Sequence, residues 1–294
     1  MMQSVNSQDL TRKKYIQGYL DNPSKSIALM GMSGVGKTTL SRLLPQSAWF
    51  HYSVDYRIGT RYLNEAVNDF LKCEAMKNPL FAQLLRTDSI FIGANLTIDN
   101  LAPLSVYLGM VGQLQKGGLT LETFLARLDA HRQAEIAATQ DVVYFIEKAK
   151  NLYGYPNFLC DTSGSLCEID HPATWEILAA HCLLIYIKST PTMQQALIER
   201  AQKYPKPLYY QKEFLLRSIA TYCQERSLLT SDEIDPAEFA IWVFPHLVSH
   251  RLGLYQKIAD QYGLTVAATD TALIKNERDF IEFIQDQALR NMKY

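Results

Sequence analysis

The sequence predicts an α/β fold in which a parallel sheet is covered by helices on both faces, with a largely helical insertion. Three observations support this fold class. Short apolar segments typical of buried strands alternate with helical segments. A glycine-rich run follows the first predicted strand, and strand signals become rare over a long stretch after the second predicted strand. With 294 residues and 48% hydrophobic content, the chain can bury a large core.

The glycine-rich run, Gly-Met-Ser-Gly-Val-Gly-Lys-Thr at residues 31–38, fits the Walker A pattern G-x-x-x-x-G-K-[ST]. It follows a predicted strand at residues 26–30 and precedes a predicted helix at residues 38–44. In such loops, backbone N–H groups surround phosphate oxygens, the lysine reaches the β- and γ-phosphates, and the hydroxyl ligates Mg²⁺. The run therefore predicts a nucleotide site formed by Gly31, Ser33, Gly34, Val35, Gly36, Lys37, Thr38 and Thr39.

The remaining elements of the predicted sheet follow in order. Aromatic and β-branched residues predict a strand at 49–54, and short apolar runs predict strands at 157–160 and 182–187. A late strand is expected at residues 263–266. A proline after an N-cap residue starts one helix at Pro191 and another at Pro236. Further helices are expected over residues 10–20, 119–139, 142–152 and 280–289.

This pattern predicts two regions. Residues 1–61 and 154–294 are expected to form a nucleotide-binding core. Residues 62–153 are expected to form a helical insertion, which is a possible substrate or partner region.

Composition excludes several classes. Lys and Arg number 29 against 30 Asp and Glu, so the chain has no overall positive charge and nucleic-acid binding is not expected. The apolar runs are too short to span a bilayer, the N-terminus has no apolar signal core, and five cysteines are scattered without a C-x-x-C pair. These observations predict a cytoplasmic protein with reduced thiols and no membrane partner.

In open parallel sheets, ligands gather at the carboxyl ends of the strands. The polar residues that follow each predicted strand are therefore the candidates for a site. After the second, third and fourth strands these candidates are Asp55, Arg57 and Arg61, then Asp161, then Arg200 and Lys206.

This layout resembles the P-loop small-molecule kinases, and shikimate kinase most closely. The sequence Ser53-Val54-Asp55 corresponds to the family's D-x-D, with serine in place of the first aspartate. Asp161 and the turn after it correspond to the glycine-rich end of the family's third strand. Lys206-Pro207-Leu208 stands where the family's lid ends in Arg-Pro-Leu, and lysine keeps the charge without the guanidinium fork.

The resemblance implies transfer of the γ-phosphoryl group of ATP to a hydroxyl of an unidentified small molecule. Lys37 would grip the β- and γ-phosphates, Thr38 would ligate Mg²⁺ with support from Asp161, and Asp55 would orient or deprotonate the acceptor. The resemblance also implies that Arg200 and Lys206 close over the phosphates as part of a lid. Arg57 and Arg61 would bind an anionic acceptor. ATP is favoured over GTP because the chain has no Asn-Lys-x-Asp signature.

Each assignment has a structural alternative. Asp55 is equally a turn cap or a partner of Arg57, and Asp161 lies in a turn-prone run. The four basic candidates are also compatible with solvated surface charges.

Two alternative functions stay open for the whole chain. The length of residues 62–153 and the missing first aspartate favour an ATPase or nucleotide-dependent regulator whose insertion binds a protein partner. Similar bacterial proteins are catalogued only as ATPases. A nucleic-acid end kinase or motor is disfavoured by the net charge of −1.

Overall fold

The computed structural model describes residues 7–293, and the chain forms two compact units. The sheet unit comprises Met1–Val54, Thr139–Lys203 and Phe244–Tyr294. The helical unit comprises Asp55–Ala138 and Tyr204–Val243.

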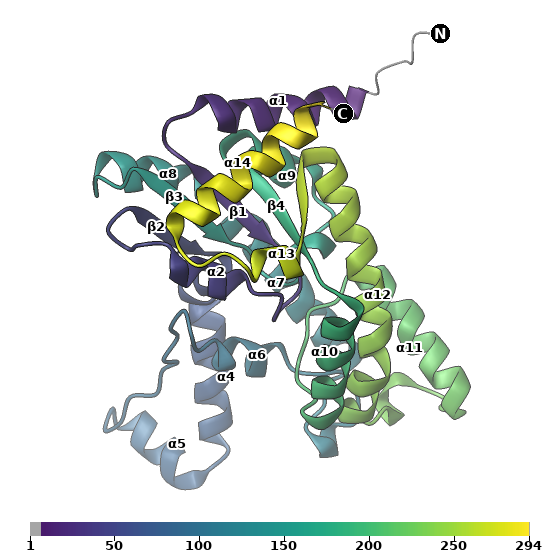
Figure 1. The fold of residues 1–294 in the computed structure, drawn as a ribbon. Coiled ribbons are helices and arrows are strands. Elements are labelled where there is room, and N and C mark those ends of the chain that lie inside the picture. The colour runs from purple at the N-terminus through teal and green to yellow at the C-terminus, as the bar shows by residue number, and fades with distance from the viewer. Residues whose placement is uncertain (1–6, 294) are drawn as a thin grey trace. The chain divides into compact units, whose positions relative to one another are not determined.

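The sheet unit is built on five parallel strands in the order β2-β3-β1-β4-β5, so the predicted α/β class with a parallel sheet is confirmed (Figure 1). The central strand β1 is buried from Ile27 to Met30 because β3 and β4 pair with it on either side. The strands are β1 (Ser26–Met30), β2 (Trp49–Ser53), β3 (Asn157–Asp161), β4 (Leu183–Lys188) and β5 (Gly263–Ala267).

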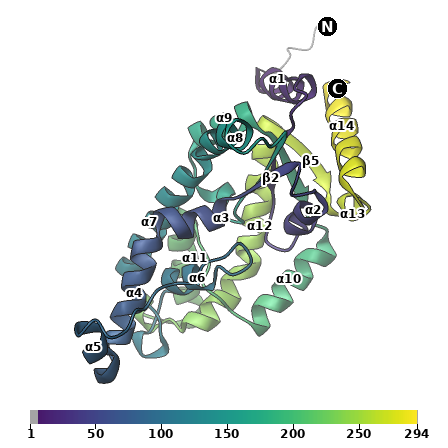
Figure 2. The same cartoon turned by 90° about the vertical axis from the view of Figure 1, so that its left-hand side faces the viewer.

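Helices lie on both faces of this sheet, as predicted. Helices α2 (Lys37–Leu43) and α14 (Glu277–Lys293) lie on one face, and α8 (Val142–Asn151) and α9 (Pro172–His181) lie on the other (Figures 1 and 2). Right-handed crossovers require this arrangement, because the chain moves one way across the sheet from β1 to β2 and the opposite way from β3 to β4. Helix α1 (Ser7–Asp21) packs on α14.

Two helix starts follow the predicted capping chemistry. The Thr190 hydroxyl accepts a hydrogen bond from the Met193 amide at the start of α10 (Pro191–Lys203). The Asp235 carboxylate accepts from the amides of Ala237 and Glu238, where α12 (Pro236–Tyr262) begins.

The helical unit consists of helices and turns, with two isolated β-bridges among its described residues. Phe124 packs edge-on against Tyr210, and Tyr222 packs against Phe239 and Trp242, so side chains far apart in sequence form its core. Helices α7 and α12 contribute residues to both units. The remaining helices and helical turns of the chain are α3 (Val54–Arg57), η1 (Ile58–Tyr62), α4 (Asn64–Met76), α5 (Pro79–Arg86), α6 (Ala102–Leu108), η2 (Leu114–Lys116), α7 (Leu121–Gln140), η3 (Leu166–Glu168), α11 (Lys212–Arg226), η4 (Ser231–Glu233) and α13 (Ala268–Thr271).

The boundaries of the two units differ from the predicted 62–153 insertion in three places. Residues 55–61, expected in the core, belong to the helical unit. Helix α8 belongs to the sheet unit because it packs on β2 and β3. Residues Tyr204–Val243, expected in the core, belong to the helical unit. There the Lys116 ammonium lies 2.6 Å from the Asp235 carboxylate, which joins positions 119 residues apart.

Within residues 7–293, no helix is both long and apolar enough to cross a membrane. All five cysteines are free thiols, and three of them, Cys160, Cys167 and Cys182, are buried.

The contact between β4 and β5 gives a test of the sheet. Gly263 pairs with Leu184, and a Cβ at Gly263 would collide with the Leu184 carbonyl oxygen, which is backbone and cannot rotate away. We expect Gly263→Ala to lower the free energy of unfolding by about 1–3 kcal/mol in urea denaturation. The control is Gly253→Ala in α12, where a Cβ meets nothing within 4 Å and the free energy should rise by up to about 1 kcal/mol. Equal effects of the two substitutions would contradict the pairing of Gly263 with Leu184.

Candidate functional site

The loop of residues 31–38, here called the glycine loop, follows β1 and uses three backbone conformations that L-residues avoid. The φ angles are +142° at Gly31, +88° at Gly34 and +103° at Gly36. A Cβ at Gly31 would lie 2.8 Å from the carbonyl oxygen of Ile187 on β4. The glycines are therefore required by the path of the backbone.

Lys37 lies across the glycine loop. Its side chain is buried, and its ammonium donates hydrogen bonds to the carbonyl oxygens of Gly31 at 2.8 Å and Met32 at 3.4 Å. Among the described residues, no acceptor is found for the amides of Gly34 and Gly36. A loop with outward amides and a lysine at its centre suits an anion with several oxygens.

Asp161 ends β3, the strand that pairs with β1 on the side of β2. The Thr38 hydroxyl lies 3.4 Å from Oδ2 of Asp161, which fits a weak hydrogen bond. The other oxygen, Oδ1, is buried and has no hydrogen-bond partner among the described residues. Burial raises the pKa of the Asp161 carboxyl, and the Lys37 charge and the Thr38 hydroxyl oppose that rise.

The turn after β3 packs against the glycine loop. The Thr162 hydroxyl donates to the carbonyl of Leu29 on β1 at 2.9 Å. A Cβ at Gly164 would lie 3.4 Å from the amide nitrogen of Ser33, so the two loops are in close contact. Ser163 and Ser165 are buried, and their hydroxyl oxygens lie 3.3 Å apart.

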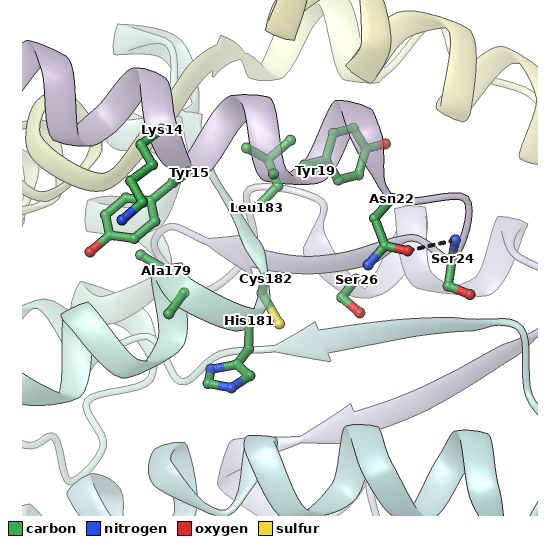
Figure 3. A pocket seen from close by; sticks show the side chains of 12 residues that line it. Lys14, Tyr15, Tyr19, Asn22, Ser24, Ser26, Ala179, His181, Cys182 and Leu183 are labelled. Atoms are coloured by element: carbon green, nitrogen blue, oxygen red, sulfur yellow. Dashed lines mark hydrogen bonds between the residues drawn. The ribbon is translucent and has the colours of Figure 1, made fainter.

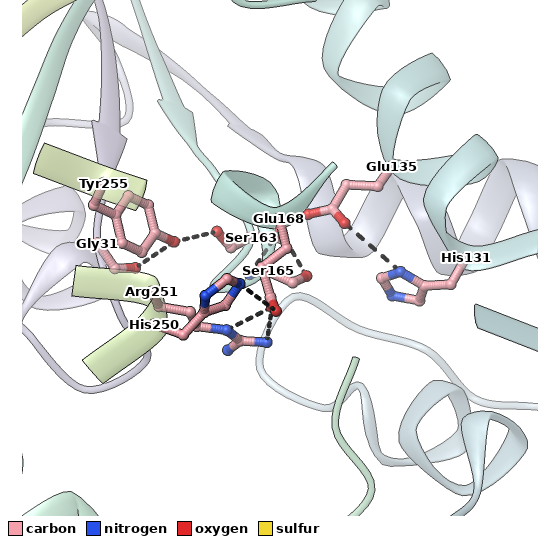
Figure 4. Close-up of polar contacts among 9 residues, drawn as sticks. All are labelled: Gly31, His131, Glu135, Ser163, Ser165, Glu168, His250, Arg251 and Tyr255. Carbon is pink, nitrogen blue, oxygen red and sulfur yellow. Dashed lines mark hydrogen bonds and ion pairs between the residues drawn. The ribbon is translucent and has the colours of Figure 1, made fainter. Parts of the chain in front are cut away.

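Tyr255 on α12 links these two loops. Its buried hydroxyl lies 3.3 Å from the carbonyl oxygen of Gly31 and 3.3 Å from that of Ser163 (Figure 4). A phenol has one proton, so the hydroxyl donates to one carbonyl at a time. The ring of Tyr255 stacks on Tyr186 of β4 with centroids 5.2 Å apart, which fixes its position.

One helical turn earlier, Arg251 holds the end of the same β3 loop. Its guanidinium donates to Oε2 of Glu168 through Nε at 2.7 Å and Nη2 at 2.6 Å (Figure 4). Both side chains are buried, and His250 lies 4.0 Å from the other carboxylate oxygen. Burial is the largest single effect and lowers the pKa of Arg251, but the charge and hydrogen bond of Glu168, together with Cys167 and Tyr255, raise it, and the net shift is upward.

Arg200 of α10 lies beside the glycine loop. Its Nη2 is 3.8 Å from the position of a Cβ at Gly34, and Leu197 Cδ2 is 3.3 Å from the same point. The Arg200 side chain is exposed. Of the sequence-predicted residues outside the loop, Asp161 and Arg200 therefore lie next to it.

The other predicted residues belong to the helical unit. Asp55 is half-buried in α3, directly after β2, and the Arg57 guanidinium lies 5.7 Å from the centre of the Tyr62 ring. Arg61 and Lys206 are exposed. Ser53 is opposite Asp161 in the β2–β3 register.

Tyr255, Arg251 and Glu168 were not among the residues predicted from the sequence. A signal was present in α12, where a stripe of buried residues at helical spacing includes Leu247, Arg251 and Tyr255. A charged residue on an apolar stripe needs a buried partner. The identity of that partner, 83 residues away, could not be predicted from the sequence.

No protein-family model matches the chain, and no curated protein is significantly similar to it. Within residues 7–293, no three His, Cys, Asp or Glu side chains are arranged to hold a metal ion. Thr38 and Asp161 offer two oxygen ligands, which is a smaller set than a site made entirely of protein side chains but is compatible with Mg²⁺. This ion usually takes one or two protein oxygens and completes its shell with phosphate and water.

The buried Asp161 carboxylate gives a stability test. Its pKa is raised by burial, so its ionised form costs folding free energy at neutral pH; this cost decreases as the pH falls below the folded-state pKa and is lost near the ordinary value of 3.8. We expect Asp161→Asn to raise the free energy of unfolding at pH 7 by about 0.5–2 kcal/mol, with a smaller gain at acidic pH. The exposed Asp286→Asn serves as control in urea denaturation. If Asp161→Asn lowered the free energy of unfolding at pH 7, the conclusion that the buried Asp161 carboxylate costs stability would be wrong.

The stacked residues Tyr255 and Tyr186 give a matched pair of variants for testing the role of the Tyr255 hydroxyl. The Tyr255 hydroxyl bridges the loops, whereas the Tyr186 hydroxyl is buried without a partner among the described residues, and burial raises the pKa of Tyr186 to about 12. We expect Tyr255→Phe to lower the free energy of unfolding by about 1–2 kcal/mol and to speed amide exchange in the glycine loop. Tyr186→Phe should do neither. The same exchange rates in both variants would exclude a bridging role.

Proposed function

We propose that the protein is an ATP-binding P-loop phosphotransferase that transfers the γ-phosphoryl group of ATP to a hydroxyl of a small molecule. The observation that carries this proposal is Oδ1 of Asp161, which lies beside the hydroxyl of Thr38 and is buried without a hydrogen-bond partner within residues 7–293. A buried carboxylate oxygen without a donor is costly unless a cation or a bound water completes its interactions. Its position at the Walker A loop suits Mg²⁺ carried by a nucleotide.

The nucleotide side of the reaction rests on the sheet unit. Lys37 binds the β- and γ-phosphates, and the amides of the glycine loop donate hydrogen bonds to the remaining phosphate oxygens. Thr38 and Asp161 would hold Mg²⁺, which would supply positive charge to neutralise the phosphates. Arg200, beside Gly34, supplies a further positive charge near the same phosphates.

The acceptor side rests on the resemblance to small-molecule kinases. The acceptor oxygen forms a bond to the γ-phosphorus while the bond from that phosphorus to the β–γ bridging oxygen breaks, and ADP leaves. The hydroxyl proton passes to the carboxylate of Asp55. Arg57, Arg61 and Lys206 are the candidates for an anionic acceptor and for the lid, and all three remain predictions.

A second function, a nucleotide-dependent regulator that docks a protein, is favoured by one feature of the helical unit. Around α5, several large apolar side chains are exposed, with Phe91 at 88% and Leu80 at 60%. Exposed apolar groups that gather along one segment are typical of interaction surfaces. The other members are Met76, Phe81 and Ile98.

The test begins with nucleotide binding. A ligand that binds only the folded state stabilises it by about 2.7 kcal/mol at a concentration of 100 Kd. We expect a non-hydrolysable ATP analogue with Mg²⁺ to raise the melting temperature of the wild type. Lys37→Ala should abolish this shift with an unchanged circular dichroism spectrum, because the central charge of the loop is lost. An unchanged shift in Lys37→Ala would place the nucleotide elsewhere and end the proposal.

A metabolite panel then separates the two functions. In the presence of the ATP analogue, we expect one class of hydroxylated compound to add a further thermal shift, and with ATP to accelerate ADP formation with a phosphorylated product. If the nucleotide binds but no compound raises the rate of ADP formation, the proposal of phosphoryl transfer is wrong. Association with a protein that differs between ADP and the analogue would then support the regulator.

A further inference from the structure

The sheet unit contains a cavity of about 410 Å³ far from the glycine loop. It lies at the amino ends of β1 and β4, where Ser26 and Leu183 begin the two strands (Figure 3). The glycine loop follows the carboxyl end of β1, and a five-residue strand separates the two by about 16 Å. The cavity therefore does not belong to the nucleotide site, and its volume is in the range of small-molecule sites, about 300–1,000 Å³.

The charge of the lining favours an anion. Lys14 contributes an ammonium, and none of the twelve lining residues is acidic. The Asn22 side-chain oxygen accepts from the Ser24 amide, which leaves the NH₂ group of Asn22 as a donor. The hydroxyls of Ser24 and Ser26 lie on the same side of the cavity in Figure 3.

The rest of the lining is mostly apolar, apart from His181, whose Nδ1 lies 2.9 Å from the carbonyl oxygen of Ile177. The rings of Tyr15 and Tyr19 come from α1, and Leu183 comes from the start of β4 (Figure 3). Lys25 lies near but is already occupied, since its ammonium donates to the carbonyls of Tyr19 and Asn22. Lys14 is thus the cation that the cavity offers to a ligand.

Gly18 keeps the cavity open. It lies in the interior of α1, lines the cavity, and a Cβ built on it meets nothing within 4 Å. Glycine is the least favourable residue in a helix interior apart from proline, and here neither a positive φ nor a close backbone contact requires it. A larger side chain at this position would project into the space that a ligand would use.

We propose that this cavity is a second ligand site, distinct from the nucleotide site, that binds a small aromatic carboxylate. The carboxylate pairs with Lys14 and accepts hydrogen bonds from Asn22 and the serine hydroxyls. The ring lies against Tyr15, Tyr19 and Leu183. This inference stands independently of the proposed kinase function.

The probe for the test is 4-hydroxybenzoate, titrated into the full chain and followed by ligand-observed NMR. We expect a millimolar or tighter Kd, at least ten-fold tighter than for the neutral isostere 4-hydroxybenzamide. Gly18→Leu places a side chain in the cavity and should weaken binding at least ten-fold. The matched control is Gly253→Leu in α12, also an open helical glycine, which should bind as the wild type does.

A second variant keeps the test decisive if Gly18→Leu fails to fold. Lys14→Gln removes the charge from an exposed position and should make the acid and the amide bind equally. Lys37→Ala should leave binding unchanged, which separates this site from the nucleotide site. The proposal is overturned if the wild type does not bind the carboxylate, if the amide binds as tightly, or if Gly18→Leu binds as the wild type does.

Discussion

The parallel pairing of β1 with β3 is the constraint on which the candidate site depends. The register joins Ser26 to Phe158 and continues to Leu29 opposite Asp161, so Asp161 lies next to the strand end from which the glycine loop begins. A shift of one residue would turn the Asp161 side chain to the other face of the sheet. Its contact with Thr38 would then be lost. Burial of the apolar residues of both strands fixes this register, and so the core determines the geometry of the polar site.

The region around the glycine loop concentrates buried polar groups that cost stability. Asp161 Oδ1 is buried without a hydrogen-bond partner among the described residues, and the Glu168–Arg251 pair is almost fully removed from water. Buried ion pairs of this kind rarely add net stability, because desolvation offsets their attraction. They do fix geometry, since breaking one partner leaves an uncompensated charge. Helix α12 therefore restrains the loop after β3 through two side chains that are one helical turn apart. Tyr255 contacts the start of that loop and Arg251 contacts its end. Such rigidity would favour the proposed phosphate binding, because a preorganised site needs little reorganisation.

Much of this fold could be predicted from the sequence because its signals are local. Each strand is a short apolar run, and caps such as Asp235 mark the helix starts. The glycine loop and Asp161 were found for the same reason, as a motif and as a strand-ending carboxylate. The boundary of the helical unit was not predicted, because it depends on contacts such as Lys116 with Asp235. The bridge from Tyr255 to Gly31 spans 224 positions, and no local pattern encodes it. The unsatisfied oxygen of Asp161 depends on packing in the same way.

The two ends of the sheet differ in a way that follows from how parallel strands are connected. At the carboxyl ends, the loops after β1 and β3 carry glycines, hydroxyls and a carboxylate, and they are tied together by hydrogen bonds. At the amino ends, the cavity beside α1 is lined by the ammonium of Lys14 and by no acidic side chain among the described residues. The strands between them, β1 and β4, are almost entirely buried and hydrogen-bonded to neighbours on both sides, so they form a stiff connection. Coupling between the two ends would need an element with two discrete arrangements, and a buried, fully paired sheet is poorly suited to that role. Ligands at the two ends would therefore stabilise the same unit without changing each other's affinity, and a measured coupling between them would require a movement of α1 or of the glycine loop.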